Sequence, residues 1–161
     1  DGSRNNLVPF EKDWETIQLY IQMEQFRSSN HFNYHLHADE ELLNGGYKVP
    51  PLLIQPLIEN AIQHGLINKL EGPCDLWVNA TLNDEHIIYT IADNGIGQKR
   101  ATALRQMNKP EHQSFGTQLA AERIRLHNNN KRIIGMVVKD KDVESIDSGT
   151  LVTVTIIANE N

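Results

Sequence analysis

The sequence predicts an α+β fold, a two-layer sandwich in which helices cover one face of a mixed sheet of about five strands. Apolar residues recur at helical spacing in segments 10–29 and 55–65. Apolar and polar residues alternate in 75–82 and 86–92, and a short turn joins these strands into a hairpin. Because a hairpin is antiparallel, the sheet is expected to be mixed, and strands packed under a layer of helices are typical of this class.

Length and composition narrow the function classes. The chain has 161 residues, which suits one domain with a real core, and its formal net charge is −6. No block of Lys and Arg occurs, so we expect no nucleic-acid partner. No run approaches the roughly 18 apolar residues of a membrane span, so no direct membrane contact is expected. Cys74 is the single cysteine, which excludes an internal disulfide and fits a reducing compartment.

The helix predicted at 10–29 carries apolar stripes on two opposite sides. The first stripe consists of Phe10, Trp14, Ile17 and Ile21, and the second of Leu19, Met23 and Phe26. A helix lying on a domain needs only one apolar face. Either the second stripe meets something absent from this chain, or the helix is sandwiched inside its own domain.

Three further strands are predicted at 32–38, near 132–139 and at 150–157, where apolar residues alternate with polar ones. His35 and His37 share one face of the first of these strands. A zinc site needs three or four ligands, and no further cluster completes this pair, so metal binding here is not expected.

The helix at 55–65 is expected to begin at the prolines 50–51 and to end at Gly65. Its apolar arc consists of Ile54, Leu57, Ile58, Ala61 and Ile62. Asn60, Gln63 and His64 fall on the opposite arc, which presents an amide and an imidazole one turn apart. Such a face is suited to holding a ligand, although an ordinary polar surface explains it as well.

The strand 86–92 runs directly into Asp-Asn-Gly-Ile-Gly at 93–97. This order places a carboxylate at a sheet edge, and the two glycines allow the backbone to approach a ligand closely. A simple turn would lead into another strand, but the residues from 98 to 114 are polar and irregular. Phe-Gly-Thr-Gln-Leu at 115–119 then opens a helix expected at 117–128.

These three elements, in this order, resemble the N, G1 and G2 boxes of the ATP-binding domain of sensor histidine kinases, which has the Bergerat (GHKL ATPase) fold. The phrase Pro-Pro-Leu-Leu-Ile-Gln-Pro-Leu-Ile-Glu-Asn-Ala-Ile-Gln-His-Gly at 50–65 is nearly that of the LytS-like branch. The resemblance spans about residues 7–158. It implies a linker helix at 1–30, from a missing dimerisation region, and an ATP-binding catalytic domain at 31–161 with an ATP lid at about 98–115.

The resemblance also implies a function. The domain would bind ATP with Mg²⁺ and transfer the γ-phosphate to a histidine on an upstream helix that this chain lacks. The longer protein would be a homodimer and an inner-membrane sensor, with this domain on the cytoplasmic side. Its partners would be its own upstream dimerisation and phospho-acceptor helices and a response regulator.

The resemblance assigns roles to particular residues. Asp93 would accept the adenine amino group, with Thr150 assisting through water, because a buried carboxylate makes a charge-assisted bond. Asn60 would supply the neutral protein oxygen that Mg²⁺ needs. His64 would contact the phosphates. Glu59 completes the implied catalytic set with Asn60 and His64 by ordering water, although it is equally a candidate for a surface salt bridge.

The lid and its hinges make up the rest of the implied nucleotide site. Gly95 and Gly97 would let the loop turn over the nucleotide. The backbone amides around Gly116 and Thr117 open a helix, where anions bind well, and Leu119 matches the second box.

Three positions depart from the related patterns. Gln118 and Ala121 replace a glycine and an asparagine of the family's G2 box. This leaves open a degenerate domain that holds nucleotide weakly or not at all and acts through protein contacts. An ATP hydrolase of the gyrase kind is the other alternative. Those relatives carry a water-orienting glutamate four residues before the magnesium asparagine, where this chain has Pro56.

Overall fold

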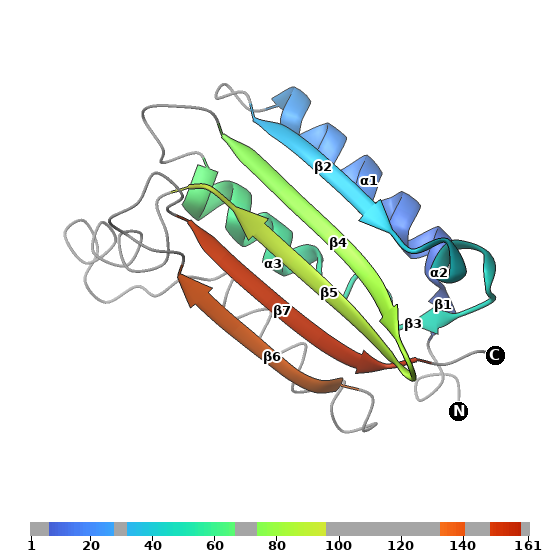
Figure 1. The fold of residues 1–161 in the computed structure, drawn as a ribbon. Helices are drawn as coiled ribbons and strands as arrows, with labels where there is room; N and C mark the ends of the chain where they lie inside the picture. Colours follow the sequence, from blue (N-terminus) through green and yellow to red (C-terminus); the bar gives the residue numbers. More distant parts are fainter. Residues whose placement is uncertain (1–6, 28–31, 67–73, 96–132, 141–148, 159–161) are drawn as a thin grey trace.

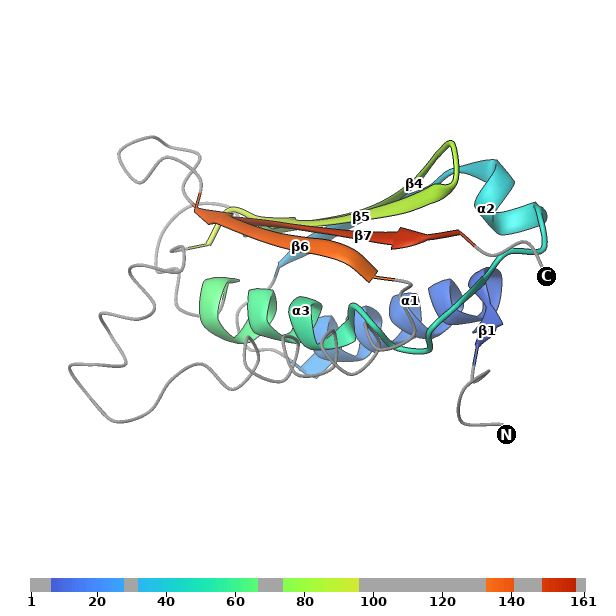
Figure 2. The ribbon, with the colours of Figure 1, turned by 90° about the horizontal axis from the view of Figure 1, so that it is seen from below.

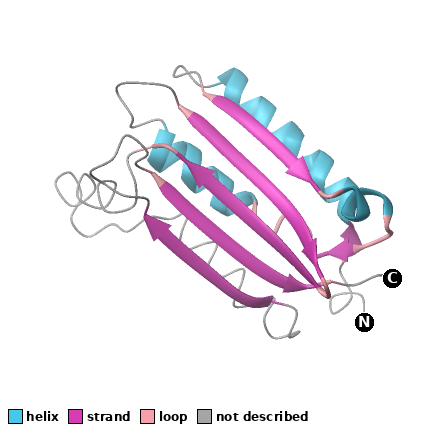
Figure 3. Cartoon of the chain, in the orientation of Figure 1, coloured by secondary structure: helices cyan, strands magenta, loops and turns pink. Residues whose placement is uncertain are grey.

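The computed structural model describes residues 7–27, 32–66, 74–95, 133–140 and 149–158. These residues form a five-stranded sheet with helices on one face, which confirms the predicted α+β two-layer class (Figure 1, Figure 3). The described elements are β1 (Val8–Pro9), α1 (Phe10–Arg27), β2 (Asn33–Ala38), α2 (Glu40–Asn44), β3 (Lys48–Val49), α3 (Gln55–Asn60), η1 (Ala61–Leu66), β4 (Asp75–Asn83), β5 (His86–Asp93), β6 (Ile133–Asp140) and β7 (Thr150–Ile157).

The large sheet has the strand order β2-β4-β5-β7-β6. Strands β2 and β4 are parallel, and the crossover connection that joins them contains α2, β3, α3 and η1. The remaining neighbours, β4–β5, β5–β7 and β7–β6, are antiparallel. The mixed sheet is therefore confirmed, and each of the five strands lies within one residue of its predicted bounds.

The core lies between the sheet and the helices α1 and α3, which run side by side beneath it (Figure 2). Each central strand turns alternate residues toward them, among which are Val78, Ile91 and Val154, all at most 1% exposed. Phe10 of α1 stacks on Tyr89 of β5, with ring centroids 6.3 Å apart. Burying one such side chain stabilises the fold by about 1.5–3 kcal/mol, so α1 is held firmly against the sheet.

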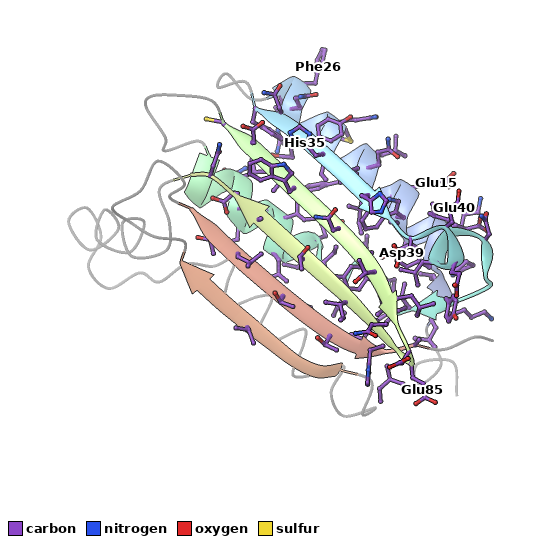
Figure 4. The ribbon with its side chains drawn as sticks, in the orientation of Figure 1. Glu15, Phe26, His35, Asp39, Glu40 and Glu85 are labelled. Carbon is purple, nitrogen blue, oxygen red and sulfur yellow. The ribbon has the colours of Figure 1, made fainter. Side chains whose placement is uncertain are left out.

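Helix α1 buries one of its two apolar stripes and exposes the other. Ile17 and Ile21 are fully buried, whereas Leu19, Met23 and Phe26 are 60%, 69% and 94% exposed. Phe26 projects away from the molecule in Figure 4. Within the described part of the chain, the expectation of a helix sandwiched inside its domain is therefore wrong. No helix among these residues is long and apolar enough to cross a membrane.

The sequence pattern predicted that the N-box helix begins at the prolines 50–51. The helix begins instead at Gln55. Leu52 has a φ of 54°, a left-handed conformation that a helix cannot contain, so residues 50–54 form turns. The buried Asp13 of α1 fixes this turn, because its Oδ1 accepts the Leu52 N–H at 2.8 Å. The helix then widens after Asn60 into the π-helical turn η1. The sequence reasoning had also missed α2 and the small β1–β3 sheet.

Candidate functional site

The candidate site lies at the end of the sheet where the interior strand β5 ends and its neighbour β7 begins (Figure 1). Asp93, the last residue of β5, is 2% exposed, and its Oδ1 accepts the Gly95 N–H at 2.8 Å. This short bond closes the turn after the strand and holds the carboxylate in place. The structure therefore places a buried acceptor where the sequence predicted a carboxylate at a sheet edge.

Thr150 and Asp93 are direct partners in the antiparallel β5–β7 ladder, and Thr150 is 5% exposed. The residue before it, Gly149, has a φ of 135°, and a Cβ there would lie 1.9 Å from the carbonyl oxygen of Asp93. Only glycine permits so close an approach of two backbones. Gly149 is thus a site residue that the sequence reasoning had missed, although its position directly before Thr150 was a usable signal.

Asn94 fastens the turn to the neighbouring strand β4. Its Oδ1 accepts the backbone N–H of Asp75 at 2.7 Å, and its Nδ2 donates to Asp75 Oδ2 at 3.2 Å. On the face of the sheet that the helices leave open, the His35 ring stacks on Trp77. Its Nε2 lies 3.3 Å from Asp75 Oδ1. Asn94 therefore acts as a cross-strand clamp that ties the turn after Asp93 to β4.

Asn60, the last residue of α3, is 5% exposed. The sequence prediction placed it on the arc opposite the apolar one, and its burial was not foreseen, because a helical wheel gives only a direction, whereas burial depends on which elements flank the helix. Gln63 is exposed as expected. The backbone of His64 lies in η1, at the same end of the molecule as Asp93, and its side chain is outside the described residues (Figure 1).

Glu59 is exposed. Burial, followed by the carboxylates of Glu24 and Glu59, raises the pKa of the Tyr20 hydroxyl of α1 well above its usual range. Gln63, four residues after Glu59, donates from Nε2 to Glu24 Oε2 of α1 at 3.3 Å. Glu59 therefore shares its side of the helix with Gln63.

Several predicted site residues fall in parts of the chain that the structure does not describe. They are Gly97, Gly116, Thr117 and Leu119, together with the lid at 98–115, the helix at 117–128, and the departures Gln118 and Ala121. Their roles stay predictions. The described candidate residues are thus a buried carboxylate and a buried hydroxyl that pair across β5 and β7, and a buried amide at the end of α3.

Solved structures identify the class of this fold. The chain aligns with the mycobacterial sensor histidine kinase MprB at a TM-score of 0.61 and 12% identity, covering 96% of this chain and 98% of that one. It aligns with the catalytic domain of histidine kinase ThkA at a TM-score of 0.59 and 12% identity, covering 94% and 95% of the two chains. The fold is that of a histidine kinase catalytic domain.

Sequence comparison identifies the relatives within that class. Sensor protein LytS of Oceanobacillus iheyensis is 32% identical over 150 residues, which cover 91% of this chain and 24% of the relative. LytS of Bacillus subtilis is 30% identical over 135 residues, covering 84% and 21%. No family model matches the chain. The chain is a homologue of LytS sensor proteins, and it spans about a quarter of their length.

Proposed function

We propose that this chain is the ATP-binding catalytic domain of a two-component sensor histidine kinase. In this proposal it binds ATP with Mg²⁺ and passes the γ-phosphate to a histidine on an upstream helix of a longer protein. The observation that carries the proposal is the buried Asp93 beside Thr150 at the sheet edge toward which the Asn60 helix also runs. The homology to LytS sensors and the kinase fold support it.

The described donor set suits Mg·ATP. Asp93 offers a buried anionic acceptor for the adenine amino group, and the Thr150 hydroxyl beside it can hold a bridging water. Asn60 offers a neutral oxygen, and Mg²⁺ usually takes only one or two protein ligands because phosphate and water oxygens supply the rest. When bound, Mg·ATP supplies the phosphoryl group together with the charge that neutralises the leaving diphosphate.

The other proposed roles follow the family resemblance. His64 and the amides around Gly116 and Thr117 hold the phosphates, Leu119 packs at the second box, and Gly95 and Gly97 hinge the lid. Glu59 orders water near the phosphates. Pro56 lies in the first turn of α3, where hydrolase relatives carry a water-orienting glutamate, so hydrolysis by the isolated chain is slow.

The proposed partners lie outside this chain. The exposed stripe of α1, formed by Leu19, Met23 and Phe26, docks the phospho-acceptor helix. The longer protein is a homodimer anchored as an inner-membrane sensor, with this domain in the cytoplasm, and a response regulator receives the phosphate.

Radiolabelled phosphoryl transfer tests the proposal. We expect the chain alone to bind Mg·ATP without labelling itself from γ-labelled ATP. Added to a polypeptide that carries the acceptor helix, it should produce an acid-labile, base-stable phosphohistidine. Label on the lone chain, or no label on the acceptor, would contradict the proposed division of labour.

A degenerate domain is the second candidate, and Gln118 and Ala121 favour it because they remove two features of the G2 box. Calorimetric titration with ATP, with and without Mg²⁺, separates the two candidates. A degenerate domain would show no magnesium-dependent binding, whereas a kinase domain would bind Mg·ATP more tightly than free ATP.

A further inference from the structure

A polar bridge joins α1 to the helix that carries Asn60. Glu24 of α1 is 6% exposed, and its Oε2 accepts the hydrogen bond from Gln63 Nε2 at 3.3 Å. Its other oxygen, Oε1, is paired with the guanidinium of Arg27. A buried carboxylate is costly unless it is paired and hydrogen-bonded. The Glu24 carboxylate is therefore held in place by Arg27 on its own helix and by Gln63 of η1.

The bridge sits at the point where the helical register changes. α3 ends at Asn60, η1 begins at Ala61, and Gln63 lies within the first turn of η1. A π-helical turn is rare, and it occurs frequently at functional sites. Gln63 follows Asn60 by only three residues, less than one helical turn, so its bond to Glu24 holds the backbone directly beyond Asn60.

The same part of α1 carries the exposed stripe. Met23 and Phe26, which are 69% and 94% exposed, flank Glu24 in sequence on the outer side of the helix. Tyr20 lies one turn earlier, and burial, followed by the carboxylates of Glu24 and Glu59, raises the pKa of its hydroxyl. One turn of α1 thus has a surface open to a partner on one side and a bond to the Asn60 helix on the other.

We propose that Glu24 is a positioning residue that acts through Gln63 to orient Asn60 and so supports the binding of Mg·ATP. This inference rests on the proposed function, in which Asn60 holds the metal.

Two matched glutamine variants of the whole chain test the bridge. Gln63 and Gln25 each donate one Nε2 hydrogen bond, but Gln25 bonds the Phe32 carbonyl at 2.7 Å and so ties α1 to β2 instead of to η1. We expect Gln63→Leu to weaken Mg·ATP binding by more than about twofold and up to about tenfold, since the value of one net hydrogen bond sets the upper limit. Its binding of metal-free ATP should stay within about twofold of wild type. Gln25→Leu should leave both affinities unchanged.

A double-mutant cycle completes the test. If Glu24 acts through Gln63, the pair Glu24→Gln and Gln63→Leu should bind Mg·ATP no more weakly than the weaker single variant. Additive losses, or a loss in Gln25→Leu equal to that in Gln63→Leu, would overturn the bridge. So would folded variants that keep the wild-type dependence on Mg²⁺. A wild-type chain that binds no Mg·ATP would instead overturn the proposed function, and this inference with it.

Discussion

At the scale of single residues, the candidate site depends on backbone geometry as much as on functional groups. Asp93 supplies the carboxylate, but its position follows from its bond to the Gly95 N–H and from the close approach of Gly149. Asn94 holds the turn from the other side through Asp75. These contacts leave the carboxylate little freedom, and a preorganised acceptor of this kind loses less entropy on binding than a mobile one.

We predict that Asp93→Asn lowers ATP affinity by about ten- to a hundredfold, because a charge-assisted bond of about 1.5–3 kcal/mol is lost. Isothermal calorimetry measures the affinity, and circular dichroism checks that the fold is kept. Asp84→Asn is the matched control, since Asp84 is exposed at the distant β4–β5 turn and its left-handed φ of 56° suits asparagine. Equal affinities for the two variants would contradict the adenine role of Asp93.

We predict that Gly149→Ala destabilises the domain by at least about 1–3 kcal/mol, because alanine is strained at a φ of 135° and its Cβ would meet the Asp93 backbone. Gly135→Ala in β6 is the control, since a Cβ there has nothing within 4 Å. That change should be neutral or stabilise by up to about 1 kcal/mol, as glycine is unfavourable in a strand. Urea denaturation measures both, and equal losses would show that the Gly149 contact is unimportant.

At the scale of elements, α1 both packs the core and orients the site helix. Its inner apolar stripe lies under the sheet. Two of its buried carboxylates form hydrogen bonds outside α1, one with the turn before α3 and the other with η1. Asp13 fixes the turn before α3 through the Leu52 N–H, and Glu24 bonds Gln63 after it. The direction of the Asn60 helix is thus set by α1 at both of its ends.

We predict that Asp13→Ala lowers the free energy of unfolding by about 1.5–3 kcal/mol, because the Leu52 N–H loses a charged acceptor. Glu15→Ala serves as the control on the same helix, since its side chain is 68% exposed and should change stability by no more than about 0.5 kcal/mol. Thermal or urea unfolding compares the two variants. A loss no greater than that of the control would show that the turn does not need Asp13.

At the scale of the whole molecule, the described helices α1 and α3 cover one face of the sheet (Figure 1, Figure 2). Asp93 and Thr150 pair where β5 ends and β7 begins. The exposed stripe of α1 lies on the side of that helix away from the sheet core. Partner docking and nucleotide binding are therefore assigned to different surfaces of one body, and a variant can remove one without the other.

We predict that the double variant Met23→Ser, Phe26→Ser keeps its stability and its ATP affinity but loses phosphoryl transfer to the separate acceptor helix. These side chains are 69% and 94% exposed, so removing them leaves no cavity. Ile17→Ala on the opposite stripe is the contrast, since Ile17 is fully buried and its loss should cost about 2–5 kcal/mol. Transfer at the wild-type rate by the double variant would exclude this surface as the docking face.

The sequence alone determined the α+β class, the five strands of the large sheet and the identity of the buried carboxylate. It could do so because alternation and helical spacing are local signals, and the Asp-x-Gly-x-Gly turn follows its strand directly. The tertiary structure decided which stripe of α1 is buried, that Asn60 is covered, and that Gln63 lies toward α1. It also disclosed the contacts made by Gly149, Asp13 and Glu24. Each of these depends on contacts between segments far apart in the chain, which no local pattern specifies.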